Sequence, residues 1–258
     1  MFGFPEAQHR VYKTNFLRNV IYKFRFQEIQ NFSNKESEFR EILDSHFPQF
    51  ELKNADSVSF SFNNKNIGDI EAVKGEQKQY IFKSKNEKII LDFQNTSISV
   101  NILGNEYISF ENLQPSIEIL KNLLSNNDIK ILTNISVRKL NVIGIKNSNS
   151  PDYNIGQISF QAFNEFINDS NDIPDKQSIL NNFRVITMRN ENDFLNLKFG
   201  LNSPSNIPGN LTDIFIDNEI NSNNIIVDSL LDKLLLINKE LFNIFEWVTT
   251  ENFKNILK

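Results

Sequence analysis

Alternating apolar and polar residues predict strands over much of the first half of this chain. The stretch "LRNVIYKFRFQEI" (17–29) sets Tyr22, Phe24 and Phe26 against Lys23 and Arg25, as in a strand with one buried face and one basic face. Further strands are predicted over residues 57–62, 78–85, 87–93, 96–103 and 130–145. Polar turns at 84–87 and 94–97 should join the middle strands into an antiparallel meander.

Helical spacing of apolar residues interrupts the strands at two places in this half. It predicts helices over 34–48 and 109–127, the second with Ser109 near its N-terminus. The polar segment 146–156 reads as a linker and divides the chain into halves 1–146 and 147–258. The second half should contain a short helix at 159–167 and strands at 181–190, 193–202 and 212–217.

The strongest periodic signal is a seam of apolar residues spaced three and four apart near the C-terminus: Val227, Leu230, Leu234, Ile237, Leu241, Ile244 and Val248. Asp228 or Ser229 can cap this helix, and Thr249 or Thr250 can start a last short one. The wide apolar face either covers the sheet within one chain or pairs with a second copy or a partner. The residues assigned to self-association are Leu234, Leu241, Phe245 and Trp247.

Together these elements predict an α+β fold. We expect an antiparallel sheet in two related halves, helices packed on one side of it, and a long C-terminal helix that closes the structure. The halves could form one compact domain.

Composition limits the chemistry that is available. The chain of 258 residues has no cysteine, which excludes disulfides, thiolate catalysis and cysteine-bound zinc. The N-terminal residues lack the apolar core of a signal peptide, and no apolar run is long enough to span a bilayer. We therefore expect a cytoplasmic protein without membrane contact.

The net charge of −5 is unevenly distributed along the chain. Residues 1–146 carry 19 Lys/Arg against 17 Asp/Glu, whereas residues 147–258 carry 8 against 15. A basic N-terminal end can mark an anionic partner, although it is also consistent with an ordinary solvated strand face. The residues proposed to contact nucleic acid or a partner are Arg10, Lys13, Arg18, Lys23 and Arg25.

One strand carries polar residues where apolar ones are expected. In "NISVRKLNVIGI" (134–145), Arg138 and Asn141 interrupt a pattern typical of a strand buried on both sides. An Arg in such a position usually pairs with a carboxylate, because an unpaired buried charge is costly. Asp92 is a candidate partner, and a binding role for Arg138 and Asn141 is the alternative.

Motifs for catalysis are weak. The only histidines, His9 and His46, have no second imidazole near them in the sequence, and no Gly-rich phosphate loop is present. Residues 67–75 contain Asp69, Glu71 and Lys74, which resemble a metal-dependent nuclease set with the wrong spacing, so a solvated charged loop is favoured. The acidic run 168–175 lacks calcium-loop spacing. We expect no cofactor, no metal and no enzymatic activity.

Several segments together resemble a bacterial family of about this length. They are "VIYKFRFQEI" (20–29), "HFPQF" (46–50), "YISFENL" (107–113), "ISVRKLNVIGI" (135–145) and "FEWVTTENFKNIL" (245–257). The family is sporadically distributed and uncharacterised, so it supplies no catalytic residues. Its members carry Arg-Tyr-Ile-Asn where this chain has Arg138-Lys139-Leu140-Asn141, so the Arg and Asn are kept and the aromatic is lost.

The resemblance implies a role as well as a fold. The family's patchy distribution is similar to that of mobile anti-phage defence genes. Among such proteins, the chain is similar in implied role to the pro-CRISPR accessory proteins of type II-C Cas nucleases. This implies a non-enzymatic homodimer that binds an RNA-guided Cas nuclease or another nucleoprotein and enhances its DNA binding. A metal-dependent nuclease and a purely structural protein-binding module are the alternatives.

Overall fold

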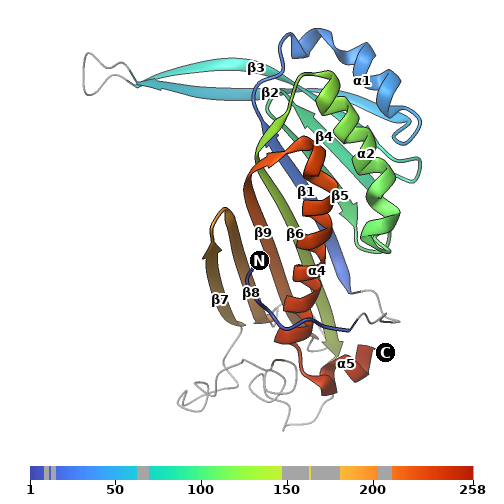
Figure 1. Ribbon diagram of the computed structural model, residues 1–258, viewed down its shortest axis with the longest axis vertical. Coiled ribbons are helices and arrows are strands. Elements are labelled where there is room, and N and C mark those ends of the chain that lie inside the picture. Colours follow the sequence, from blue (N-terminus) through green and yellow to red (C-terminus); the bar gives the residue numbers. More distant parts are fainter. Residues whose placement is uncertain are drawn as a thin grey trace.

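Nine strands form a single antiparallel sheet in the described part of the chain (Figure 1). The computed structural model describes residues 1–8, 12, 16–62, 70–146, 163, 181–202 and 211–257. Across the sheet the strands follow the order β2-β3-β4-β5-β1-β6-β9-β8-β7. The strands from the first half of the sequence therefore lie side by side, and those from the second half extend the same sheet beyond β6.

The strands begin and end as follows: β1 Leu17–Phe26, β2 Gln49–Phe62, β3 Ile70–Lys83, β4 Ile89–Gln94, β5 Ser97–Leu103, β6 Ile131–Lys146, β7 Asn181–Asn190, β8 Asp193–Asn202 and β9 Leu211–Ile226. The helices are α1 Glu36–Leu43, α2 Phe110–Asn126, α4 Leu230–Val248 and α5 Glu251–Leu257, with short 3-10 turns η1 Phe32–Asn34 and η4 Val227–Ser229. These elements confirm the α+β class and the long C-terminal helix.

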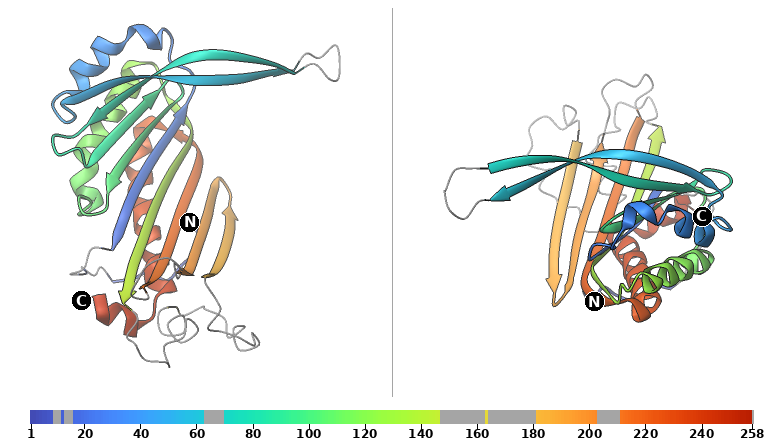
Figure 2. Two further views of the ribbon diagram at one scale, coloured as in Figure 1. Left: turned by 180° about the vertical axis from the view of Figure 1, so that it is seen from behind. Right: turned by 90° about the horizontal axis from the view of Figure 1, so that it is seen from above.

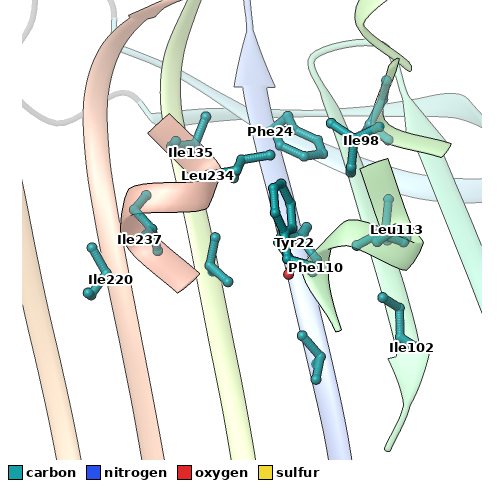
Figure 3. Close-up of a cluster of buried hydrophobic side chains, with 14 of the residues drawn as sticks. Tyr22, Phe24, Ile98, Ile102, Phe110, Leu113, Ile135, Ile220, Leu234 and Ile237 are labelled. Atoms are coloured by element: carbon teal, nitrogen blue, oxygen red, sulfur yellow. The ribbon is translucent and has the colours of Figure 1, made fainter. Parts of the chain in front are cut away.

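Helices α1, α2 and α4 pack on one face of the sheet, as the sequence predicts (Figure 2). Alternation in β1 decides which side chains meet them: Tyr22 and Phe24 are fully buried beneath the helices. Figure 3 shows these two rings between Ile98 of β5 and Leu234 of α4. Fully burying side chains of this size contributes about 2–3 kcal/mol each. The sheet is therefore anchored at its centre by the strand that also carries the basic residues.

The hairpin of β2 and β3 is longer than the sequence pattern indicates. The two strands pair from Gln49 with Lys83 to Phe62 with Ile70, but β3 pairs with β4 only over residues 80–83. The rest of the ribbon extends away from the sheet (Figures 1 and 2). The expectation of a loop over 67–75 is therefore wrong for residues 70–75, which lie in β3.

The second half differs from expectation mainly in the length of β9. The strand expected at 212–217 continues to Ile226, where η4 and α4 follow directly. The expected linker from residue 147 onward and the helix at 159–167 lie outside the described residues, apart from Phe163, which forms an isolated bridge with Thr249.

Candidate functional site: the open face of the sheet

The basic residues of β1 point away from the helices. Lys23 and Arg25 alternate with buried Tyr22, Phe24 and Phe26, so their side chains lie on the opposite face of the sheet. No described helix covers this face, which we call the open face (Figure 2).

Of the other predicted basic residues, the structure describes only Arg18. Arg18 is exposed where the pairing of β1 with β6 shifts register. Arg10 and Lys13 lie outside the described residues.

A hollow of about 420 Å³ lies on the open face where β1, β6, β9, β8 and β7 run together. We call it the polar dish. Its lining combines two cations, one carboxylate, one aromatic ring and several amides and hydroxyls: Lys23, Arg25, Asn134, Ser136, Thr187, Phe194, Asn196, Glu219, Asn221 and Asn223. The volume is in the range of small-ligand sites. The dish is therefore large enough to hold part of an extended polar ligand.

Register places these side chains on five neighbouring strands. Arg25 lies opposite Asn134, and Asn134 lies opposite Asn223 on the next strand. The Asn134 amide Nδ2 donates to Asn223 Oδ1 at 3.0 Å. This bond leaves the Asn134 oxygen and the Asn223 amide nitrogen without a partner among the described residues. The floor of the dish therefore presents an acceptor and a donor side by side.

Electrostatics make the β1 side of the dish positive. Neither Lys23 nor Arg25 forms an ion pair within the part of the chain that the structure describes. The carboxylate of Glu219 is held by Ser136, whose hydroxyl donates to Oε1 at 2.5 Å. The lining therefore carries two positive charges against one negative charge, in a chain whose net charge is −5.

One aromatic ring, that of Phe194, borders the other side of the dish. The guanidinium carbon of Arg189 lies 5.2 Å from the centroid of the half-buried Phe194 ring, within the range of a cation–π contact. Farther along the same face, Lys198 lies 4.2 Å from the Phe183 ring centroid. A planar aromatic ligand could therefore stack on the Phe194 ring, whose position is held by the contact with Arg189.

Arg138, on β6, pairs with Asp217 rather than with Asp92, so the expected partner is wrong. Its Nε and Nη2 donate to the two carboxylate oxygens at 2.7 and 2.6 Å. Asp92 is excluded by topology, because β5 and β1 separate β4 from β6 by roughly 14 Å at the usual strand spacing. The hydrogen bonds to Asp217 raise the pKa of Arg138 most. Partial burial opposes the rise, and the negative charges of Asp217 and Glu219 reinforce it.

Asn141, the second unusual residue of this strand, also has a structural role. It is buried, and its Nδ2 donates to the backbone oxygen of Ile216 on β9 at 3.3 Å. Both unusual residues of the 134–145 strand thus hold β6 to β9. The ion-pair interpretation of Arg138 holds, with a different carboxylate.

The residues assigned to self-association lie inside the chain. Leu234 and Leu241 are fully buried against the sheet, and Phe245 is 5% exposed. Trp247 is half-buried, with its ring centroid 5.1 Å from that of Phe4 in an edge-on arrangement. The assignment is therefore corrected: the α4 seam is core, because the sheet takes up one side of it and the N-terminal residues cover another.

Residues 1–8 lie along α4 and bind two of its buried polar side chains, Glu240 and Asn243. The backbone N–H of Phe2 donates to Glu240 Oε1 at 2.8 Å, and that of Ala7 donates to Asn243 Oδ1 at 3.1 Å. Both side chains are buried in the fold. This contact explains why α4 carries polar residues beside its apolar seam, a feature that periodicity alone does not explain.

The residues of the nuclease alternative are only partly described. Asp69 lies outside the described residues, and Glu71 and Lys74 lie in β3 without described side chains. His9 and the acidic run 168–175 are likewise outside, while His46 is exposed, with its Nδ1 3.0 Å from Ser45 Oγ. Within the described ranges, no three His, Asp or Glu side chains are grouped so that they could hold a metal ion.

Sequence reasoning found the β1 side of the dish and missed the remainder. Phe194, Asn196 and Glu219 come from strands β8 and β9, whose open-face positions alternate with buried Leu195, Leu197 and Ile220. That alternation was available in the sequence. What it lacked was the order of the strands, which sets β9 beside β6.

Comparison with known proteins adds no family. No protein-family model matches the chain, and no curated protein matches it significantly. Among the described helices, none is long and apolar enough to cross a membrane.

Proposed function

We propose that this protein is a non-enzymatic accessory protein that binds nucleic acid, free or within a nucleoprotein, through the polar dish. The observation that carries the proposal is the pair Lys23 and Arg25. Both cations line the dish from one strand, and neither forms an ion pair with a carboxylate among the described residues. In an acidic chain, this local excess of positive charge favours an anionic ligand.

Phosphate is the ligand group that fits these two cations. Lysine and arginine contact nucleic-acid backbones without reading sequence, and such contacts position a chain along the surface. Lys23 and Arg25 are two residues apart on one strand, about 7 Å at the usual rise. Two cations so spaced can contact neighbouring phosphates of one strand.

The salt dependence of binding tests the proposal. Fluorescence anisotropy of a labelled oligonucleotide would be measured between 50 and 200 mM salt for the wild type and for Lys23→Gln/Arg25→Gln. Two phosphate contacts contribute about 1.4 to the slope of log K against log salt for a single strand. We expect the double variant to lose a slope of that size and to bind more weakly.

The control for the loss of two positive charges is Lys35→Gln/Arg40→Gln, which removes two cations at α1, on the face of the sheet that the helices cover. This variant should keep the wild-type slope. Binding that does not change between 50 and 200 mM salt would refute the proposal. Cleavage with Mg²⁺ or Mn²⁺ that is lost in Glu71→Ala would replace it with the nuclease alternative.

The family resemblance supports a wider role in anti-phage defence. In that role, the protein homodimerises, binds an RNA-guided Cas nuclease and enhances its DNA binding. Analytical ultracentrifugation would measure the oligomeric state. Titration of a type II-C Cas nuclease with labelled target DNA, with and without this protein, would measure the enhancement. An unchanged Kd for the DNA would reject this wider role and leave the nucleic-acid contact to be judged by its own experiment.

A further inference from the structure

We infer that the polar dish selects single-stranded nucleic acid, with an unstacked base placed against Phe194 while the backbone lies along Lys23 and Arg25. This inference rests on the proposed function and adds the ligand's form and the residue that determines it. The evidence for it is the part of the dish farthest from β1, because phosphate binding by Lys23 and Arg25 leaves that part unoccupied.

The two chemistries lie at opposite ends of the dish. Lys23 and Arg25 belong to β1, and Phe194 belongs to β8, with β6 and β9 between them. Three strand spacings separate the ends by roughly 14 Å. A short oligonucleotide can lie across this distance with a phosphate at one end and a base at the other.

The ring of Phe194 is suited to stacking. It is half-buried and lines the dish, while Arg189 lies 5.2 Å from its centroid. Aromatic side chains on the face of a sheet stack on unpaired bases in single-strand binding proteins, with little dependence on sequence. In a duplex the base faces are already stacked on one another, so a duplex on this surface offers no free base face to Phe194.

The groups between the two ends match the edges of a base. The Asn134–Asn223 pair leaves one acceptor and one donor available, and the Asn221 side chain has no hydrogen bond among the described residues. An amide can donate and accept at once, as base edges require. Glu219 adds a carboxylate acceptor for a base amino group. In a duplex the Watson–Crick edges are occupied by pairing, so only an unpaired base can offer them to these groups.

The experiment compares one 12-nucleotide sequence as single-stranded RNA, as single-stranded DNA and as a DNA duplex, by anisotropy at 50 mM salt. A second readout uses 2-aminopurine in the single strand, whose fluorescence falls when the base stacks. We expect tighter binding of at least one single strand than of the duplex. Stacking on an aromatic residue corresponds to a loss of about 5- to 150-fold in affinity for Phe194→Ala.

Two further variants make the result decisive. Phe194→Leu keeps an apolar side chain but removes the ring. In this variant, binding should no longer lower the 2-aminopurine fluorescence. Phe183→Ala removes an aromatic ring from the same face but outside the dish, and it should bind like the wild type. Thermal unfolding would confirm that all three variants fold.

The failure of this inference differs from the failure of the proposed function. Equal affinity for single strand and duplex, with unchanged binding by Phe194→Ala, would overturn the inference. The proposed function would still stand if the salt slope depended on Lys23 and Arg25. No binding of any of the three nucleic acids would overturn both. Preference for a single strand that is lost in Phe194→Ala and kept in Phe183→Ala supports both.

Discussion

The ion pair between Lys233 and Asp193 ties α4 to the strand that carries Phe194, and its removal should measurably destabilise the protein. Lys233 Nζ lies 2.7 Å from Asp193 Oδ1, and the two side chains are 20% and 12% exposed. Asp193 also accepts a hydrogen bond from the fully buried Ser222 hydroxyl. The carboxylate thus joins a helix and two neighbouring strands.

The magnitude follows from what each substitution leaves behind. Breaking one side of a fully buried pair costs about 3–5 kcal/mol. Because both side chains keep some exposure and Ser222 still donates, we expect Lys233→Met to cost about 2 kcal/mol. Asp193→Asn keeps an acceptor for Ser222 and should cost about 1 kcal/mol. The double variant should lose less free energy of unfolding than the sum of the two single losses, by a coupling energy of about 1–2 kcal/mol.

Urea denaturation of the four proteins measures these free energies, with unchanged m values as the condition for comparing them. Lys239→Met is the matched control on the same helix, since its partner Glu6 is 74% exposed, and no measurable change is expected there. A Lys233→Met variant within about 0.5 kcal/mol of the wild type, or a strictly additive double variant, would refute this account of α4 docking.

Three further substitutions probe the core and the sheet. Gly104→Ala would place its Cβ 1.5 Å from the Leu17 backbone oxygen, so it should cost about 3 kcal/mol or more by overpacking; thermal unfolding would measure this, and a neutral result would contradict the contact. Leu241→Ala should cost about 2–5 kcal/mol as a core cavity, and ultracentrifugation should show an oligomeric state like that of the wild type; dissociation of a dimer instead would restore the interface interpretation. Burial, reinforced by Tyr107, raises the pKa of Tyr22 well above 10, so folded Tyr22 keeps its proton where the unfolded chain loses it. Stability should fall above about pH 10, and urea denaturation at pH 9 and 11 should show a smaller fall for Tyr22→Phe.

The fold class was predictable because each element carried its own periodic signal. Alternation marked β1 and β5, and three-four spacing marked α2 and α4. Two of the expected local caps agreed, whereas Ser229 stands at the N-terminus of α4 without a side-chain cap hydrogen bond. Ser109 accepts a hydrogen bond from Asn112 N, and Thr250 Oγ1 accepts one from Phe253 N at the start of α5. Such features depend on neighbours in sequence, so one chain reveals them.

The long hairpin and the full length of β9 were not predictable in the same way. The segment 218–226 is dominated by asparagine and serine, which disfavour strands by propensity. It is held as a strand because Asn218, Ser222 and Ile220 face α4 and β8, where Asn218 Nδ2 donates to Leu241 O at 3.1 Å. Tertiary contacts with a distant helix override the local preference there.

The ion pair of Arg138 was predictable from the sequence, but the carboxylate that forms it was not. An Arg within an apolar strand needs a carboxylate on physical grounds, and that need is visible in the sequence. Which carboxylate satisfies it depends on strand order. Asp217 lies 79 positions away, and only the pairing of β6 with β9 brings it near. Lys23 and Arg25 show the opposite case, because alternation alone assigned them to the open face.

A polar open face by itself would not support a functional conclusion. Antiparallel sheets commonly turn one face to water, and in an asparagine-rich chain such a face should carry amides. What departs from that expectation is the charge balance. Arg138 on the same face pairs with Asp217, whereas Lys23 and Arg25 have no acidic partner among the described residues, although the chain has more acids than bases. The nucleic-acid proposal therefore depends on those two cations, and the amides and Phe194 bear only on which form of nucleic acid they hold.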